Sequence, residues 1–259
     1  MHDYIVEPDA IPWREGQVAG ITFKCQVLLS GTEGGPEALR FRFDPHPSVF
    51  AHMHLTSQFQ LLLQGRMDFP KSTMKLRSLA VHYTDHNYPY GPFAVAEGHE
   101  MLVLHPKQGG LISMADRDAR RQINLMGRHL YGAAAAIEWT RMSEFGGLRC
   151  KPLIPPASGP YAVMLECPPH TLLDLPAALD GRYEVVLTGS ASIADRWLLP
   201  PGFRYISQSI NDRGISTPLK AGPDGATLML LAFDRDAREG GLTGEGLSIA
   251  AAAAMERAI

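Results

Sequence analysis

Two histidines one residue apart, His52 and His54, are the side chains of this sequence best suited to chemistry. Residues two positions apart on an extended strand point to the same face, so one metal ion could contact both imidazoles. An isolated His-x-His sequence of this kind often occurs by chance. Gln58 follows His54 by four residues and Gly65 follows Gln58 by seven, with an apolar run between them. The full pattern, His-x-His-x3-Gln-x6-Gly, is more specific and strengthens the case for a metal site.

The elements that must position this motif are short strands. Runs rich in Val, Leu, Phe and Tyr are separated by Gly, Pro, Asp and Asn, which is typical of strands joined by turns. Strands are predicted over residues 38–43, 59–63, 79–84, 101–105, 183–187 and 228–233. About 100 residues organised in this way predict a sandwich or jelly-roll barrel. Helices are expected only over residues 117–130 and 245–257.

The sequence repeats itself once. Gln58 to Gly65 aligns with Arg182 to Gly189 at an offset of 124 residues, and Glu97 to Leu104 aligns with Asp224 to Leu231 at an offset of 127. Trp13 has a counterpart in Trp139. Such a sustained register predicts two copies of one barrel.

The motif resembles the first motif of the cupin superfamily: His-x-His, three or four residues, Glu, six residues, Gly. The spacing agrees throughout, and Gln58 stands where the family usually has glutamate. The resemblance covers residues 20–110 and, through the repeat, residues 145–235. It implies an all-β fold of two tandem cupin-type jelly-roll barrels, a bicupin, with a few short helices. It also implies a metal ion in the first barrel, with His52, His54 and Gln58 as ligands.

We therefore expect four regions. Residues 1–115 form an N-terminal barrel with the metal site, and residues 116–140 form a partly helical linker. Residues 141–238 form a second barrel without metal ligands, and residues 239–259 form a helical tail. The second barrel is expected to bind no metal because Pro176, Ala178 and Arg182 stand at the aligned ligand positions.

The second cupin motif supplies one more histidine, and two residues compete for this role. His86 is followed at the usual cupin distance by the Glu97-Gly98 turn and the closing strand, which favours His86 as the ligand. His82 shares its strand face by alternation and remains the alternative, as a ligand or as a neighbour of one. The other histidines without ligand spacing are predicted at the surface or at strand ends, namely His46, His99, His105 and His129.

Composition narrows the partners. The 259 residues carry a formal net charge of −3 and no recurring basic run, so a small-molecule substrate is expected rather than nucleic acid. No apolar stretch approaches the roughly 18 residues that span a bilayer. The first residues lack a secretory pattern, and the three cysteines are odd in number without a Cys-x-x-Cys pair, which favours a cytoplasmic location. A homodimer is one option that the sequence leaves open.

Three neutral imidazoles and an amide would leave a divalent ion its full charge, which favours an anionic substrate. These donors suit Fe(II), our first expectation, and also Zn, Ni, Mn or Cu. Three-histidine cupins often carry out dioxygen chemistry, so the resemblance implies a non-haem metal oxygenase acting on a small organic acid, dicarbonyl or aromatic compound. A lyase or isomerase, a non-catalytic module that binds a metal or small ligand, and a metal-free barrel remain as alternatives.

Overall fold

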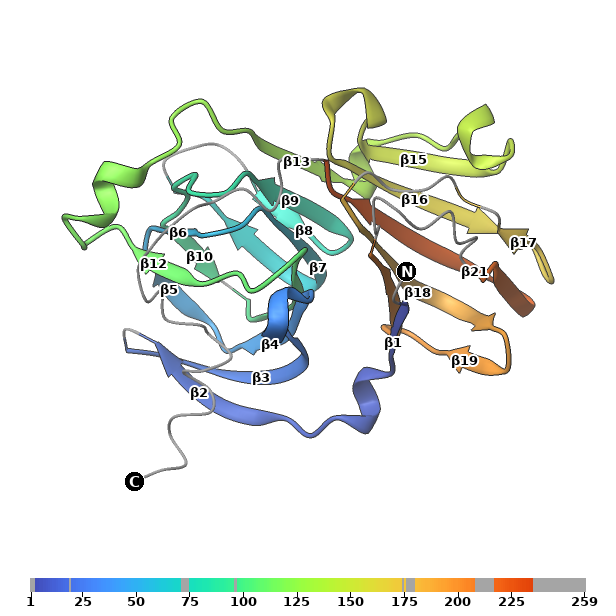
Figure 1. Cartoon of the computed structure of the whole chain (residues 1–259), viewed down its shortest axis with the longest axis horizontal. Coiled ribbons are helices and arrows are strands. Elements are labelled where there is room, and N and C mark those ends of the chain that lie inside the picture. The colour runs from blue at the N-terminus through green and yellow to red at the C-terminus, as the bar shows by residue number, and fades with distance from the viewer. Residues whose placement is uncertain are drawn as a thin grey trace. The chain divides into compact units, whose positions relative to one another are not determined.

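The computed structural model describes residues 3–18, 20–70, 75–95, 97–173, 175, 180–207 and 217–234. These residues form two compact units built from strands, with helix limited to short 3-10 turns (Figure 1). We call residues 11–133 the N-terminal barrel, and residues 1–10 together with 134–235 the C-terminal barrel. The predicted all-β architecture of two tandem units is confirmed. Within the described ranges, no helix is long and apolar enough to cross a membrane.

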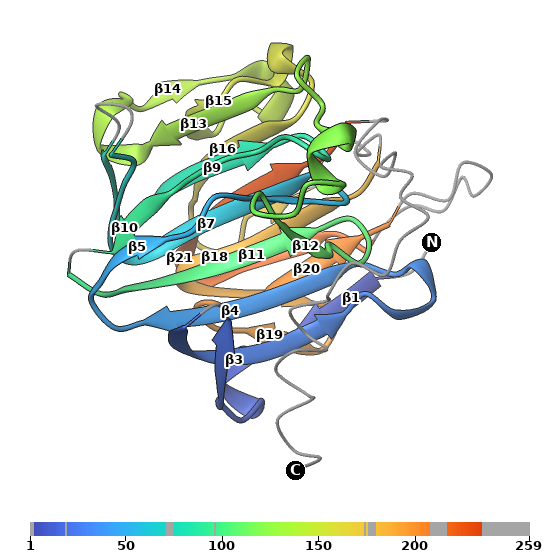
Figure 2. The ribbon, with the colours of Figure 1, turned by 90° about the vertical axis from the view of Figure 1, so that its left-hand side faces the viewer.

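The N-terminal barrel is dominated by one antiparallel sheet. Its strands are β2 (Arg14–Val18), β3 (Ile21–Ser30), β4 (Glu37–Phe43), β5 (His46–Val49), β6 (His52–His54), β7 (Gln58–Asp68), β8 (Lys75–Arg77), β9 (Ala80–Thr84), β10 (Phe93–Val95), β11 (His99–His105), β12 (Leu111–Ser113) and β13 (His129–Ala133). Its 3-10 turns are η2 (Thr32–Gly34) and η3 (Ala119–Gln122). The main sheet has the order β13-β9-β7-β11-β4-β3-β2, whose middle strands lie side by side in Figure 2, while β6 pairs with β12.

The C-terminal barrel repeats this arrangement. Its strands are β1 (Asp3–Val6), β14 (Thr140–Arg141), β15 (Arg149–Ile154), β16 (Tyr161–Cys167), β17 (Leu172–Leu173), β18 (Arg182–Ile193), β19 (Arg196–Leu198), β20 (Phe203–Ile206) and β21 (Leu219–Ala232). Its 3-10 turns are η1 (Pro8–Ala10), η4 (Ala134–Ala136), η5 (Ser143–Phe145) and η6 (Pro156–Ser158). The sheet order β1-β20-β18-β21-β16-β15-β14 matches the other barrel strand for strand, with β18 in the place of β7 and β20 in the place of β9. The repeat seen in the sequence is therefore a repeat of topology.

One domain boundary and one helix differ from those predicted. Strand β1 comes early in the chain but pairs with β20, so residues 1–10 belong to the C-terminal barrel. The helix predicted over residues 117–130 is wrong, because this stretch contains only the turn η3 and then enters β13. Strand β13 pairs with β9 along its whole length, and these long-range backbone hydrogen bonds override local helix propensity. The predicted tail over residues 239–259 lies outside the described residues.

The glycine that closes the motif has a steric role in both barrels. Gly65 has a φ of +88°, and a Cβ atom there would lie 2.1 Å from the carbonyl oxygen of Gly98. Gly189 has a φ of +71°, and its Cβ would lie 2.2 Å from the carbonyl oxygen of Gly225. Only glycine allows such a close approach of two backbones. This explains why the second half keeps the glycine without the histidines.

Alternation along the strands separates core from surface. On β3, Ile21, Phe23 and Cys25 are buried, and the residues between them are exposed. On β7, Leu62 packs into the same apolar core. Because residues two apart share a face, Gln58 and Gln60 also point inward, and both are buried. Strand β7 therefore brings two amides into the interior of the barrel.

Candidate functional site

Backbone pairing places Tyr90 directly opposite His52. The amide of His52 donates to the carbonyl of Tyr90 at 3.1 Å, and the amide of Tyr90 donates back to His52 at 3.0 Å. The amide of Asn87 bonds the carbonyl of His54 at 2.7 Å, so residues 87–90 run along β6. Residues directly opposite each other in an antiparallel pair share a face. The side chain of Tyr90 therefore points to the same interior as the two histidines.

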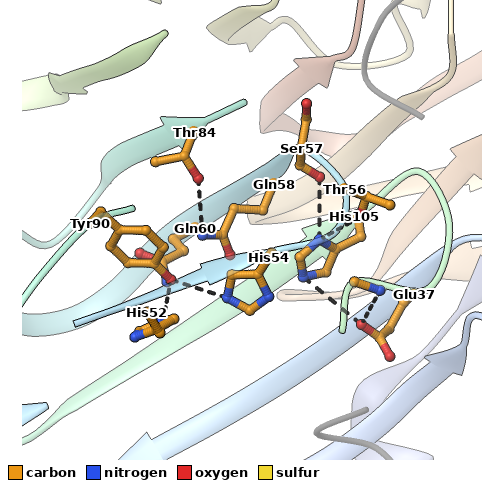
Figure 3. Close-up of polar contacts among 11 residues, drawn as sticks. Glu37, His52, His54, Thr56, Ser57, Gln58, Gln60, Thr84, Tyr90 and His105 are labelled. Carbon is orange, nitrogen blue, oxygen red and sulfur yellow. Dashed lines mark hydrogen bonds and ion pairs between the residues drawn. The ribbon is translucent and has the colours of Figure 1, made fainter. Parts of the chain in front are cut away.

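The hydroxyl of Tyr90 lies between the two imidazoles (Figure 3). It is 2.6 Å from His52 Nε2 and 3.3 Å from His54 Nε2. The ring of Tyr90 stacks on that of His54, with an angle of 19° between the planes. All three side chains are at least 96% buried, with exposed fractions of 4%, 3% and 4% for His52, His54 and Tyr90. The structure thus brings together His52 and His54, as predicted, and adds a phenol.

Hydrogen bonds to backbone carbonyls fix which ring nitrogens carry protons. His52 Nδ1 lies 2.8 Å from the carbonyl of Phe50, which can only accept, so Nδ1 carries the proton and Nε2 is bare. His54 also donates its proton to a backbone carbonyl, that of Gly110. Burial lowers the pKa of His52 to about 4 and that of His54 well below its usual range. Both rings are therefore neutral at pH 7, and both offer a lone pair to the point where Tyr90 holds a single proton.

Gln58 adds a third acceptor. Its Nε2 donates to Thr84 Oγ1 at 3.1 Å. Its Oε1 is buried and has no hydrogen-bond partner among the described residues. Buried polar atoms are nearly always partnered, so this oxygen is available to a bound ion or water molecule. The site therefore contains more lone pairs than protons, and a bound cation would satisfy the excess.

Gln60 and His82 hold the far side of Tyr90. His82 Nδ1 donates to Gln60 Oε1 at 2.8 Å, and Gln60 Nε2 donates to the hydroxyl of Tyr90 at 3.0 Å. The other nitrogen of His82 lies 2.7 Å from Nε2 of His129, a half-buried residue at the start of β13. Burial lowers the pKa of His82 well below its usual range. His82 is thus a neighbour that orients the site through Gln60.

His86 lies in the turn after β9. Its backbone amide donates to Ser57 Oγ at 3.2 Å, and its Nδ1 is buried and has no hydrogen-bond partner among the residues that the structure describes. In the described part of the chain, no hydrogen bond or ring contact joins His86 to His52 or His54. Nor do the described residues contain a group of three or more His, Cys, Asp or Glu side chains placed to hold a metal ion. The side chain that is hydrogen-bonded to both His52 and His54 in this part of the chain is Tyr90.

Four further residues of the site, His105, Glu37, Gln60 and Tyr90, were absent from the ligand set predicted from the sequence. His105 was predicted at the surface or at a strand end, and it does end β11, but it is 1% exposed and its ring centre is 5.0 Å from that of His54. Its Nε2 is 3.9 Å from Oε2 of Glu37, which is 2% exposed. Gln60 could have been found from its alternation with Gln58 on β7. Tyr90 gave no spacing signal, because its position depends on pairing with β6.

The space beside these groups is small. Phe23, Phe41, Phe93, Met101 and Val103 line it together with the two histidines, Gln60 and Tyr90. The cavity has a volume of about 40 Å³. At roughly 10–15 Å³ for each water, this is room for about three molecules. The cavity thus has one polar wall and one aromatic wall and suits only a very small ligand.

The same strands of the C-terminal barrel carry charges instead. Arg182 replaces Gln58, and Glu184 replaces Gln60 on the inward face of β18. Arg204 pairs with Glu184 as His82 pairs with Gln60, and the three charged residues have exposed fractions of 2%, 0% and 1% for Arg182, Glu184 and Arg204. Glu184 accepts hydrogen bonds from Nε of both arginines, at 3.0 and 2.9 Å. Pro176 and Ala178 lie outside the described residues.

Comparison with known proteins places this architecture. No family model matches the sequence, and no curated protein matches it. A candidate dioxygenase from Nostoc punctiforme has a TM-score of 0.66 at 14% identity, over 92% of this chain and 84% of that one. The pirin YhhW of Escherichia coli, in complex with nickel(II), has a TM-score of 0.54 at 7% identity, over 90% and 100%. The 11S allergen of Cocos nucifera has a TM-score of 0.51 at 11% identity, over 90% of each chain.

These structures belong to the cupin superfamily, and at such identities the likeness concerns the fold. The chain has the cupin fold, in its form with two tandem barrels.

Proposed function

We propose that this protein is a metal-dependent cupin enzyme, a non-haem metal oxygenase acting on a small organic acid, dicarbonyl or aromatic compound. The N-terminal barrel would hold one divalent transition metal, iron in the first place, with Zn, Ni, Mn or Cu as the other candidates. His52, His54 and Gln58 would be its ligands. One observation carries the proposal: two bare imidazole nitrogens and an unpartnered amide oxygen are buried together around one hydroxyl proton.

The protein prepares these donors for a cation. Burial keeps both histidines neutral, which is the form that binds metals. The carbonyls of Phe50 and Gly110 fix the ring orientations, as partners of metal-bound histidines commonly do. The likeness to a candidate dioxygenase and to a pirin with nickel(II) is consistent with this proposal. The C-terminal barrel, whose aligned groups include Arg182, is proposed to bind no metal.

The bound ion would supply Lewis acidity and open coordination positions for the substrate. The chain's own groups do the rest. The aromatic wall formed by Phe23, Phe41 and Phe93 keeps water out and packs against the apolar part of a ligand. Gln60 donates a hydrogen bond to the hydroxyl of Tyr90 and so fixes this polar group at the edge of the cavity. With about 40 Å³ of space, the cavity favours a substrate of only a few heavy atoms.

The proposed compartment is the reducing cytoplasm. Cys25, Cys150 and Cys167 are all free thiols and all buried. Burial raises the pKa of Cys25 and of Cys167 to about 12, so neither is a reactive thiolate at neutral pH.

Elemental analysis and oxygen consumption test the proposal together. Purified protein, or protein reconstituted with Fe(II) under anaerobic conditions, is expected to contain close to one ion per chain. The double variant His52→Ala, His54→Ala should lose the ion and keep its circular dichroism spectrum. The Fe(II) form should then consume dioxygen with one of a panel of small hydroxy acids, diketones and catechols.

Other outcomes would replace the proposal. Protein that takes up no metal under these conditions is a metal-free barrel. Conversion of a compound under nitrogen selects a lyase or isomerase. Tight binding without any conversion selects a binding module.

A further inference from the structure

We propose that the phenolic oxygen of Tyr90 is the third protein donor to the metal ion, in the position expected for a third histidine. This inference rests on the proposed function, since it requires that the N-terminal barrel binds a metal. It replaces His86 in the predicted ligand set and leaves His52, His54 and Gln58 unchanged.

The position of the hydroxyl supports this assignment. Donor atoms that share one metal ion, each about 2.1 Å from it, lie roughly 3 to 3.5 Å apart. The hydroxyl of Tyr90 lies 2.6 Å from His52 Nε2 and 3.3 Å from His54 Nε2, which is close to that spacing. No other oxygen of the described residues is hydrogen-bonded to both His52 Nε2 and His54 Nε2. A small shift of the phenol would therefore complete a three-donor face.

The surroundings hold this oxygen firmly. The backbone bridge to His52 fixes the position of Tyr90 on one side. On the other side, Gln60 Oε1 is occupied by His82 Nδ1, so the amide nitrogen of Gln60 must face the phenol. Burial raises the pKa of the Tyr90 hydroxyl, and the amide donor of Gln60 acts against that rise because it stabilises a negatively charged oxygen. Gln60 is therefore a positioning residue suited to a metal-bound phenolate.

This donor would change the charge of the site. Binding the ion would release the hydroxyl proton to solvent, because a phenol ligates as its anion. Two neutral imidazoles, one amide and one phenolate would leave a divalent ion with a net charge of about one, instead of two. The site would then attract a dianionic substrate less strongly than the three-histidine arrangement expected from the sequence.

Zinc binding followed by ultraviolet absorbance tests the assignment without any turnover. Metal-free full-length protein is titrated with Zn(II) at pH 7, by calorimetry and by difference absorbance. Wild type should bind about one ion per chain and develop the difference band of one tyrosinate. Tyr90→Phe should lose the band and bind Zn(II) roughly ten- to hundredfold more weakly. Tyr88→Phe, which removes a neighbouring phenol, and His86→Ala should behave as wild type.

The results separate this inference from the function on which it rests. Zinc bound by wild type without a tyrosinate band overturns the assignment of Tyr90 and leaves the proposed function standing. So does a loss of affinity in His86→Ala that Tyr90→Phe does not show. Wild type that binds neither Zn(II) nor Fe(II) overturns the proposed function itself. The band in wild type is read without any variant, so a folding defect in Tyr90→Phe would not obscure the answer.

Discussion

At the scale of single residues, Gln58 decides the charge of the site. A carboxylate at this position could not donate to Thr84 Oγ1, as Gln58 does, and would be buried with no positive partner among the described groups. We expect Gln58→Glu to lower the unfolding free energy of the metal-free protein by about 2–4 kcal/mol at pH 7. With Zn(II) or Fe(II) the order should reverse, because the carboxylate neutralises part of the ion's charge and binds it more tightly.

Denaturant unfolding with and without metal measures both effects. Gln58→Met is the matched control, since it removes the amide oxygen without adding charge and should weaken metal binding. A metal affinity of Gln58→Glu equal to that of wild type would show that this side chain does not contact the ion.

Buried histidines make the metal-free protein sensitive to acid. Burial lowers the pKa of His99 and of His105 to about 4, from an ordinary value near 6.5. Above pH 6.5 both are neutral in the folded and unfolded states and contribute no pH dependence. As the pH falls from 6.5 to 4, the unfolded chain takes up these protons and the folded chain does not. The unfolding free energy should therefore fall by about 3 kcal/mol for each group by pH 4.

Urea unfolding at pH 7.5, 6 and 5 tests this dependence. His99 packs against the rings of Phe43 and Phe93, so His99→Phe keeps the apolar contacts and removes the titration. This variant should lose less stability between pH 7.5 and pH 5 than wild type. An equal loss in both proteins would show that His99 is not responsible.

At the scale of elements, the pairing of β7 with β11 requires a residue without a Cβ atom at Gly65. Gly65→Ala would place a Cβ 2.1 Å from the carbonyl of Gly98 at a φ of +88°. We expect a loss of about 3 kcal/mol or more, from left-handed strain and steric overlap together. Gly34→Ala is the control, because Gly34 has a φ of +75° and nothing within 4 Å of its Cβ position. It should lose only about 1–2 kcal/mol, and equal losses would contradict the steric account.

Local patterns were sufficient for the strands and for part of the site. Alternation and the spacing from His52 to Gly65 predicted β6, β7 and two inward-facing imidazoles. Pairing between distant segments was not readable. His129 and Leu130, at the end of the predicted helix, belong instead to the edge strand β13 because β9 is available beside it, and Tyr90 faces His52 because of one backbone bridge. Both depend on contacts far apart in the sequence, which a spacing pattern does not contain.

At the scale of the whole molecule, equivalent positions of the two barrels carry different chemistry. In the N-terminal barrel, β13, β9 and β7 contribute His129, His82 and Gln60. His82 and Gln60 are neutral, and His129 is half-buried. In the C-terminal barrel, β1, β20 and β18 contribute Asp3, Arg204 and Glu184, with Asp3 3.7 Å from Arg204. The polar residues of the N-terminal barrel have more lone pairs than protons, whereas those of the C-terminal barrel form ion pairs with one another. The same topology therefore carries two different polar interiors, which fits the proposed metal site in the N-terminal barrel and a structural role for the buried charges in the other.

This division predicts that one substitution in the C-terminal barrel lowers the stability of the protein and leaves its metal content unchanged. Glu184 is fully buried and accepts hydrogen bonds from two guanidinium groups. Glu184→Gln would leave a net positive charge buried there, so we expect the unfolding free energy to fall by about 3–5 kcal/mol. Glu166→Gln, which removes an ion pair with Arg149 that is about half exposed, should cost less than about 1 kcal/mol. Protein of either variant that remains folded should still contain about one metal ion per chain, because the proposed ligands are all in the N-terminal barrel. Amide hydrogen exchange should place the loss of protection in β18 and β20. A loss of metal in folded Glu184→Gln, or a stability equal to that of Glu166→Gln, would contradict a structural role for the buried charges.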